Sequence, residues 1–404
     1  MSRAPFGSVV VFRLDKIGDL LLSTPAISSV RRSLPNARLT LVASPYNHVV
    51  ADGWDALDEV RVFDRRWSWR EKTAFAGRIR AERYDLALVL SAMTDAYLLA
   101  FLSGARVRAG VVYSRRVIQR AFAPLLLTDR SVFHIDEAVK RRAAIPHEVE
   151  QMLEVVRAAG LAAEPGPLEV TIAAEDRKWA QALLHRHGLA GSLVGFHLSA
   201  GWLRDDVTGA AIRGLLDELL TAVPDRAVVL TYGEADRRAA SALADCAGLG
   251  HEPDGGAGDE VRTGWGGRVL VAGDLSFGRW AALLSACHVV VTRDTGSLHL
   301  AAALGRPVVA VYEGPTFSHC SQQWAPWRVP CRIVKDAAWS TTRAEVVAGV
   351  LELLGSATQN EQREAKAMPR ANILGGGQAF RPAGRLRGPG PAPGSCSAAA
   401  RWFC

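Results

Sequence analysis

Two short segments of the sequence place charged side chains and a glycine directly after an apolar run. The first is RLDKIGD at residues 13–19, which follows the strand-like residues 8–12. The second is TRDTGS at residues 292–297, which follows the apolar run at 289–291. In an open α/β sheet, ligands bind at the loops that follow the carboxyl ends of the strands. Both segments are therefore candidates for a functional site.

The second segment has the composition of an anion site. A strand turns through Asp294 and opens a helix whose first N–H groups belong to Thr295, Gly296 and Ser297. Unpaired N–H donors and the positive end of the helix dipole coincide there, and glycine lets a phosphate approach closely. An ordinary helix start capped by Asp294 or Thr295 has the same pattern. His299, on the same helix, could equally be a hydrogen-bonded structural side chain.

The first segment places two carboxylates beside two cations. Asp19 follows Gly18 where an apolar stretch begins, so it could cap a helix or accept a proton from a substrate hydroxyl. Asp15 is the competing base. Arg13 and Lys16 could bind a phosphate or pair with either acid.

Apolar strand-like runs alternate with helical patterns along both halves of the chain, which indicates βαβ units and parallel sheets. The expected strands are 8–13, 38–44, 59–63, 84–92, 107–113, 193–201, 226–233, 268–273, 288–294 and 307–314. The expected helices are 20–33, 71–82, 207–222, 234–247, 277–286 and 295–304, with a helical linker near 147–160. We expect two doubly wound α/β domains, 1–160 and 161–354, facing each other across a cleft. A basic tail rich in Gly, Pro and Ala, 355–404, is expected to be disordered.

Composition narrows the class of protein. The 404 residues are 49% hydrophobic and 22% charged, as expected of a globular protein, and we find neither a signal peptide nor an apolar run long enough to span a bilayer. A cytoplasmic location is the default. The net charge of +7 is concentrated in the first 150 residues and the tail, whereas 151–354 are acidic. An anionic substrate or membrane surface explains this split better than nucleic acid, because no nucleic-acid-binding motif accompanies it.

RLDKIGDLLLSTPAISSVRRSLPNARLTLVAS together with DTGSLHLAAALGRPVVAVYEGPT resembles glycosyltransferase family 9, the bacterial heptosyltransferases of lipopolysaccharide core assembly. The resemblance covers residues 8–350 in element order and is most specific in these two blocks. It implies a GT-B fold of two Rossmann-like domains, with the acceptor on the N-terminal one and the nucleotide sugar on the C-terminal one. It also implies inverting, metal-independent transfer, typically from ADP-heptose to an inner-core sugar. No D-x-D triplet of the kind that holds a metal occurs in the sequence.

The resemblance assigns roles to individual residues. It makes Asp19 the catalytic base. On the donor side it places the backbone of 295–297 at the pyrophosphate, Asp294 beside the sugar and Glu234 of TYGEADRR near the ribose. From their positions in the sequence we also expect Arg13, Lys16 and Gly18 on the acceptor side and His299 on the donor side. One departure is HLSAGWLRDDVTG, where the family usually has a phosphate-binding lysine. Arg204 is the nearest cation there and could contact the donor phosphate in its place.

A further basic segment, DRRWSWREK at 64–72, is a secondary candidate for the acceptor side. Arg65 and Arg66, with the neighbouring tryptophans, could contact lipid phosphates at a membrane interface, or the segment could be a solvated loop.

Two other functions remain open. One is a sugar-nucleotide epimerase with the same two-domain cleft, and the other is a catalytically weak glycan-binding protein, which the missing lysine would suit. A nicotinamide-dependent dehydrogenase is disfavoured, because no G-x-G-x-x-G follows any expected strand. We expect a nucleotide sugar as co-substrate, a lipopolysaccharide core glycolipid as acceptor, no metal or other cofactor, and at most a peripheral contact with the inner membrane.

Overall fold

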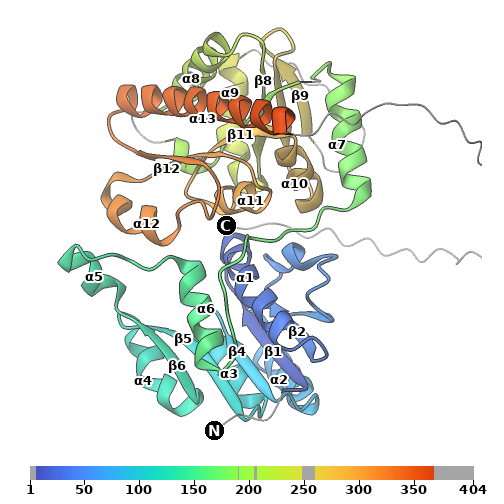
Figure 1. The fold of residues 1–404 in the computed structure, drawn as a ribbon, viewed down its shortest axis with the longest axis vertical. Helices are drawn as coiled ribbons and strands as arrows, with labels where there is room; N and C mark the ends of the chain where they lie inside the picture. The colour runs from blue at the N-terminus through green and yellow to red at the C-terminus, as the bar shows by residue number, and fades with distance from the viewer. Residues whose placement is uncertain (1–5, 190, 204–206, 248–259, 368–404) are drawn as a thin grey trace, which may run out of the picture.

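The computed structural model describes residues 6–189, 191–203, 207–247 and 260–367, which form two α/β lobes stacked along the long axis of the molecule (Figure 1). The N-terminal lobe has a six-stranded parallel sheet in the order β3-β2-β1-β4-β5-β6. Its strands are β1 (Ser8–Arg13), β2 (Arg38–Ala43), β3 (Glu59–Val62), β4 (Leu86–Val89), β5 (Val107–Tyr113) and β6 (Asp129–Phe133). Five of these were predicted; β6 was not.

Helices cover both faces of this sheet. Buried apolar side chains of α2 (Trp69–Ala81), α3 (Thr94–Leu102) and α4 (Val117–Leu126) pack on one face, and those of α1 (Ile17–Ser33) and α6 (Glu148–Ala158) on the other. The short helices η1 (His48–Ala51) and α5 (Ile135–Arg141) complete the lobe. The predicted helices 20–33, 71–82 and 147–160 are present as α1, α2 and α6.

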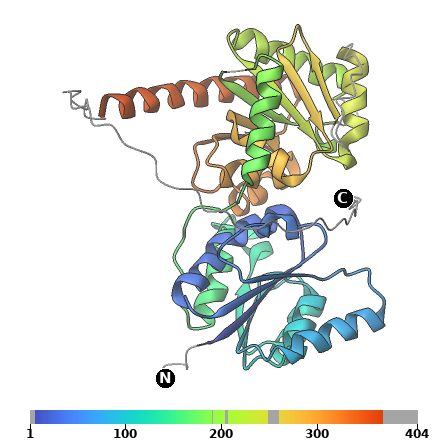
Figure 2. The same cartoon turned by 90° about the vertical axis from the view of Figure 1, so that its right-hand side faces the viewer.

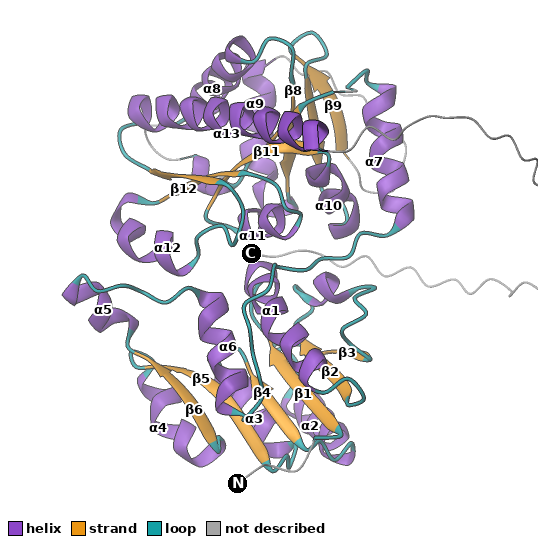
Figure 3. Cartoon of the chain, in the orientation of Figure 1, coloured by secondary structure: helices purple, strands orange, loops and turns teal. Residues whose placement is uncertain are grey.

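The C-terminal lobe has a seven-stranded sheet in the order β13-β12-β11-β7-β8-β10-β9, parallel except for β9, which is antiparallel to β10. Its strands are β7 (Leu193–His197), β8 (Ala227–Tyr232), β9 (Glu260–Gly264), β10 (Val269–Gly273), β11 (Cys287–Arg293), β12 (Val308–Tyr312) and β13 (Cys331–Lys335). The fold class is confirmed: two Rossmann-like lobes form the GT-B arrangement (Figure 3). The sequence analysis missed β9 and β13, which both lie at sheet edges.

Two helical layers enclose the second sheet. One contains α8 (Gly209–Ala222), α9 (Arg237–Ala247) and α13 (Trp339–Ala367); the other contains α7 (Ala174–Arg186), α10 (Phe277–Ser285), α11 (Gly296–Ala303) and α12 (Phe317–Gln323). Short turns η2 (Ala200–Trp202), η3 (Glu234–Asp236) and η4 (Gly314–Thr316) follow β7, β8 and β12. Figure 2 shows α13 extending away from the body of the lobe. The helix continues past residue 355, where we expected the tail to begin, and residues 368–404 lie outside the described part of the chain.

The segment between α6 and α7 runs along the N-terminal lobe. Glu169 accepts hydrogen bonds from Ser28 of α1 and from the Trp54 indole, at 2.7 and 2.9 Å, and its N–H donates to Thr24 of α1 at 2.9 Å. The domain boundary predicted at 160/161 falls at the start of this segment. Among the described helices, none is long and apolar enough to cross a membrane.

Candidate active site

The N-terminus of α1 lies directly against the N-terminus of α11, so the two segments singled out from the sequence meet at the junction of the lobes. A Cβ added to Gly18 would stand 2.7 Å from His299 Cδ2 and 3.4 Å from Gly296 Cα. A Cβ added to Gly296 would stand 3.6 Å from the backbone nitrogen of Gly18. The absence of a side chain at Gly18 therefore permits this contact, whereas a Cβ on Gly296 would stand at ordinary contact distance. The positive ends of two helix dipoles converge there.

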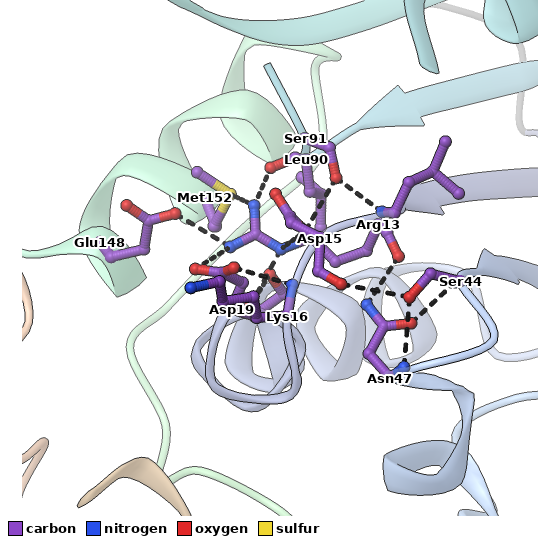
Figure 4. Close-up of polar contacts among 12 residues, drawn as sticks. Arg13, Asp15, Lys16, Asp19, Ser44, Asn47, Leu90, Ser91, Glu148 and Met152 are labelled. Atoms are coloured by element: carbon purple, nitrogen blue, oxygen red, sulfur yellow. Dashed lines mark hydrogen bonds and ion pairs between the residues drawn. The ribbon is translucent and has the colours of Figure 1, made fainter. Parts of the chain in front are cut away.

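Arg13, at the end of β1, organises the carboxylates beneath this contact (Figure 4). Its side chain is only 2% exposed. The guanidinium lies 2.9 Å from Glu148 Oε1, 3.2 Å from Asp15 Oδ1 and 3.7 Å from Asp19 Oδ1, and it also donates to the backbone carbonyl of Leu90. A buried cation needs such compensation. These contacts engage the Arg13 donors within the protein, which favours positioning of the acids over binding of an acceptor phosphate.

Asp19 stands in the first turn of α1 and lines the cavity described below. Its Oδ2 accepts a 2.9 Å hydrogen bond from the backbone N–H of Lys16, so the helix-capping role considered from the sequence is present. The side chain remains 28% exposed. Burial raises the pKa of Asp19 and Glu148 adds to the rise, while the nearby Arg13 guanidinium lowers it. A capped carboxylate with a raised pKa is a better proton acceptor than an ordinary aspartate.

Asp15, the competing base, lies on the same cavity wall. Its Oδ1 accepts a 3.0 Å hydrogen bond from the Ser91 hydroxyl, and its side chain is 25% exposed. Burial raises the pKa of Asp15 to about 7, with the Arg13 guanidinium opposing the rise. Asp19 directly follows Gly18, the residue that contacts Gly296 and His299 of α11. Asp19 is therefore the acid next to the contact between the lobes.

Glu148 connects the two lobes and was missed by the sequence analysis. Besides its ion pair with Arg13, it accepts hydrogen bonds from Tyr113 of β5 at 3.2 Å and from Gln323 of α12 at 3.0 Å. A signal was available: Glu148 belongs to the same apolar stripe of α6 as Met152 and Val155. An acid on the buried stripe of an amphipathic helix indicates a buried charge that needs a partner.

A cavity of about 280 Å³ lies between the N-terminal lobe and α12. Polar side chains from both lobes line it, including Arg13, Asp15, Lys16, Asp19, Arg115, Arg116, Glu148, His319 and Gln323. Carboxylates and cations that line one cavity suit a polyhydroxylated or phosphorylated ligand. Lys16 is exposed at its rim. Arg65 and Arg66 are not among the residues that line it; they pair with Asp95 and Asp64 near α2.

The anion site predicted from the sequence falls at the loop between β11 and α11. Thr295 is the N-cap of α11, and its hydroxyl lies 2.7 Å from the Ser297 hydroxyl. The first N–H groups of a helix have no partner within the helix, so those of 296 and 297 are available to a ligand's oxygens. Burial raises the pKa of Asp294 to about 7. A neutral or easily neutralised acid beside the helix start would reduce repulsion of an incoming diphosphate.

His299 is a packing residue in this structure. It is 5% exposed, its Cδ2 faces Gly18, and its Nδ1 has no hydrogen-bond partner within the described part of the chain. Burial lowers its pKa to about 3, so the imidazole is neutral near pH 7. The structure places His299 at the contact between α11 and α1, two residues after Ser297. Its role in the donor site stays a prediction.

The remaining donor-side predictions are placed only in part. Glu234 follows the carboxyl end of β8. Because β8, β7 and β11 are neighbouring parallel strands, Glu234 lies at the same end of the sheet as the β11–α11 loop. It is exposed there. Arg204 lies outside the described residues, so its expected contact with the donor phosphate stays a prediction.

Comparison with known proteins decides the class. Residues 216–346 match the model of glycosyltransferase family 9 (heptosyltransferase). This segment is a glycosyltransferase family 9 domain. The resemblance found in the sequence is confirmed, and the chain is a glycosyltransferase. The family 9 segment contains Asp294, the anion loop, Glu234 and His299, whereas Asp19 lies outside it.

Relatives extend the similarity to both lobes. A Haemophilus influenzae protein provisionally named a glycosyltransferase is 21% identical over 331 residues, which are 79% of this chain and 85% of that protein. The family 9 glycosyltransferase from Veillonella parvula is 17% identical with a TM-score of 0.68, covering 87% of this chain and 97% of that one. The E. coli ADP-heptose lipopolysaccharide heptosyltransferase II is 19% identical with a TM-score of 0.64, covering 88% and 99%. At this identity the structures establish a shared fold for the family 9 domain and the lobe preceding it.

Proposed function

We propose that the chain transfers a heptose, or a related sugar, from an ADP-sugar to a lipopolysaccharide core acceptor, with inversion and without a metal. The observation that carries the proposal is the contact of Gly18 with Gly296 and His299, because it brings the turn that holds Asp19 to the helix start at 295–297. A base for the acceptor and donors for the leaving group then share one junction. The similarity to the E. coli ADP-heptose enzyme supports the choice of donor.

In the proposed step, the acceptor hydroxyl gives its proton to the Asp19 carboxylate and its oxygen attacks the anomeric carbon of the donor. The bond from that carbon to the diphosphate oxygen breaks, and the electron pair leaves with ADP. The N–H groups at the start of α11 and its dipole stabilise the charge that develops on the departing diphosphate. Attack from the face opposite the diphosphate gives inversion.

The cavity and the Arg13 network supply the acceptor side. Lys16, Arg115 and Arg116 line a space that also contains Asp15 and Asp19, so a phosphorylated core sugar would meet cations while its hydroxyl meets a base. We assign the base to Asp19 because it directly follows Gly18, which contacts the start of α11 at Gly296. Asp15 is then an acid held by Ser91 and Arg13 that helps to shape the cavity.

The test supplies purified protein with ADP-heptose and a truncated core acceptor, and follows ADP release and product. We expect turnover in EDTA, lowered about 10²–10⁴-fold in kcat by Asp19→Asn. Asp15→Asn is the matched control, since it removes the same charge from the same cavity wall. Its kcat should fall much less, because Asp15 is not the proposed base. Normal turnover of the Asp19 variant would remove Asp19 as base. Conversion of donor without acceptor would indicate an epimerase, and acceptor binding without donor consumption a glycan-binding protein.

A further inference from the structure

Helix α4 presents its apolar face to solvent. Val117, Ile118, Phe122 and Leu125 are 67%, 62%, 53% and 70% exposed. These positions, with Ala121, are one, four, five and eight residues apart, so they occupy one face of the helix. On the opposite side, Ala123 is buried against the sheet. A surface helix normally buries its apolar stripe, so this reversed orientation calls for a partner.

Helix α3 extends the exposed apolar surface. Leu98, Phe101 and Leu102 are exposed and, at spacings of three and four, share one face of α3. The two helices pack together, and the Gln119 amide of α4 donates to the Thr94 hydroxyl of α3 at 3.2 Å. We call these seven side chains the α3–α4 face, namely Leu98, Phe101, Leu102, Val117, Ile118, Phe122 and Leu125. Seven exposed apolar side chains on two helices that pack together differ from apolar residues scattered singly, and such a group indicates an interaction surface.

Cations border the α3–α4 face. Arg115, Arg116 and Arg120 are exposed at the N-terminal end of α4. Near the start of α3, Arg65 pairs with Asp95, which also brings the segment 64–72 and the exposed Trp69 to this side of the lobe. The basic segment 64–72 that the sequence analysis singled out and the arginines at 115–120 thus lie on the two helices' side of the lobe. Apolar side chains ringed by arginine and tryptophan match the interface of an anionic bilayer.

The position of the patch relates it to the cavity. Arg115 and Arg116 line the cavity and directly precede the first turn of α4. An acceptor anchored in a bilayer must reach the cavity from the membrane surface, and the α3–α4 face begins at Val117, directly after Arg116 of the cavity wall. A symmetric pairing of two copies through the same face would bring their arginine borders together, which is unfavourable. A lipid surface carrying negative charge has no such penalty.

We propose that the α3–α4 face docks the enzyme on an anionic lipid bilayer, with the borders of the patch on lipid phosphates and its apolar side chains at the level of the acyl chains. This inference rests on the proposed function, because a glycolipid acceptor is what requires a membrane beside the cavity. It names the surface that holds the enzyme there.

The experiment measures flotation of the full-length protein with vesicles of phosphatidylcholine alone or with phosphatidylglycerol. We expect binding to the anionic vesicles, weakened about tenfold or more by Phe122→Ser/Leu125→Ser, since each loses the burial of a large apolar side chain. Leu125→Ser alone should weaken it less. Leu351→Ser on α13 is its matched control, because Leu351 is also exposed, at 44%, and should bind like the wild type. Arg120→Gln should reduce the preference for anionic lipid.

Equal binding by the wild type and the double variant, or no binding of the wild type to either vesicle, would overturn the proposal. Hydrogen exchange of residues 117–126 separates the occupants: protection that appears only with vesicles supports the bilayer. If residues 117–126 are protected without lipid in a dimeric wild type, and the double variant loses both the protection and the dimer, the face binds a second copy. If the wild type is a monomer and the double variant loses the protection, another segment of this chain covers the face. A lipid-free acceptor oligosaccharide should turn over equally in all variants. If no acceptor turns over while vesicle binding depends on Phe122 and Leu125, the proposed function fails and the docking surface stands.

Discussion

Gly18 of α1 and His299 of α11 are in direct contact, with no room for a methyl group between them: an added Cβ would stand 2.7 Å from the imidazole Cδ2. The two residues belong to different lobes, and the contact lies one residue from Asp19 and two from Ser297. The two candidate segments can therefore approach each other this closely only because residue 18 has no side-chain carbon.

Gly18→Ala should destabilise the protein although alanine is the better helix former. The new Cβ meets the His299 ring, and overpacking of this kind costs about 1–3 kcal/mol. His299→Ala alone leaves a cavity and also destabilises. In the double variant the Cβ gains space, so we expect a favourable coupling energy when the four melting curves are compared. Strictly additive losses would show that the lobes do not press together here in solution.

Glu148→Gln should shift the pH dependence of transfer. The Glu148 charge contributes to the raised pKa of Asp19, so its removal lowers that pKa. A base works in its ionised form, hence the rising acidic limb of the kcat profile should move to lower pH. The melting temperature should also fall, because Arg13 loses a buried partner.

The control for this change is Glu150→Gln, which alters the same charge on the same helix. Glu150 is 39% exposed and pairs only loosely with Arg157, at 3.9 Å. Its pH profile should coincide with that of the wild type. A wild-type profile for Glu148→Gln, with turnover intact, would separate Glu148 from the titration of the base.

Asp294→Asn should change how stability depends on pH. The pKa of Asp294 is raised from 3.8 to about 7, so between about pH 4 and 7 the folded chain retains a proton that the unfolded chain has released. Stability from this group is present at low pH and is lost as pH rises through 7. The free energy of unfolding of the variant should therefore rise relative to that of the wild type between pH 4.5 and 7.5, by at most about 1.4 kcal/mol per pH unit.

Melting temperatures of both proteins across that range provide the measurement. Asp225→Asn, at an exposed aspartate of the same lobe, should show a constant difference from wild type. A constant difference for Asp294→Asn as well would mean that its carboxyl titrates like an exposed one.

The melting temperatures of Gln323→Ala and Gln323→Glu should test the contact between Gln323 and Glu148 that links the lobes. The Gln323 side chain is 3% exposed, and its amide donates to Glu148 Oε2. Alanine removes one donor from a buried carboxylate, which costs about 1–3 kcal/mol. Glutamate, although nearly isosteric, sets a second carboxylate against Glu148, so it should lower the melting temperature more. The reverse order would indicate that packing volume, not charge, governs this position.

Much of the fold could be predicted because it depends on local pattern. Every described strand in the interior of either sheet was expected, since continuous apolar runs mark strands buried on both faces. The missed strands β6, β9 and β13 lie at sheet edges, where one side is open to solvent and the apolar run is interrupted; the sequence of β6, DRSVF, is an example. Asp19 and the loop at 294–297 were chosen as site candidates because strand ends in such sheets carry ligand sites.

The sequence by itself determined the two lobes, the turn that carries Asp19 and the helix start at 295–297, because spacing within a few residues is enough to specify them. Only the tertiary structure decided that Gly18 meets His299, that Glu148 joins Arg13 to Gln323, and that α4 turns its apolar face outward. Those relationships connect residues more than a hundred positions apart, or depend on what covers a helix. Charge compensation and burial act through distance in space, and distance in space is set by the packing of the whole chain.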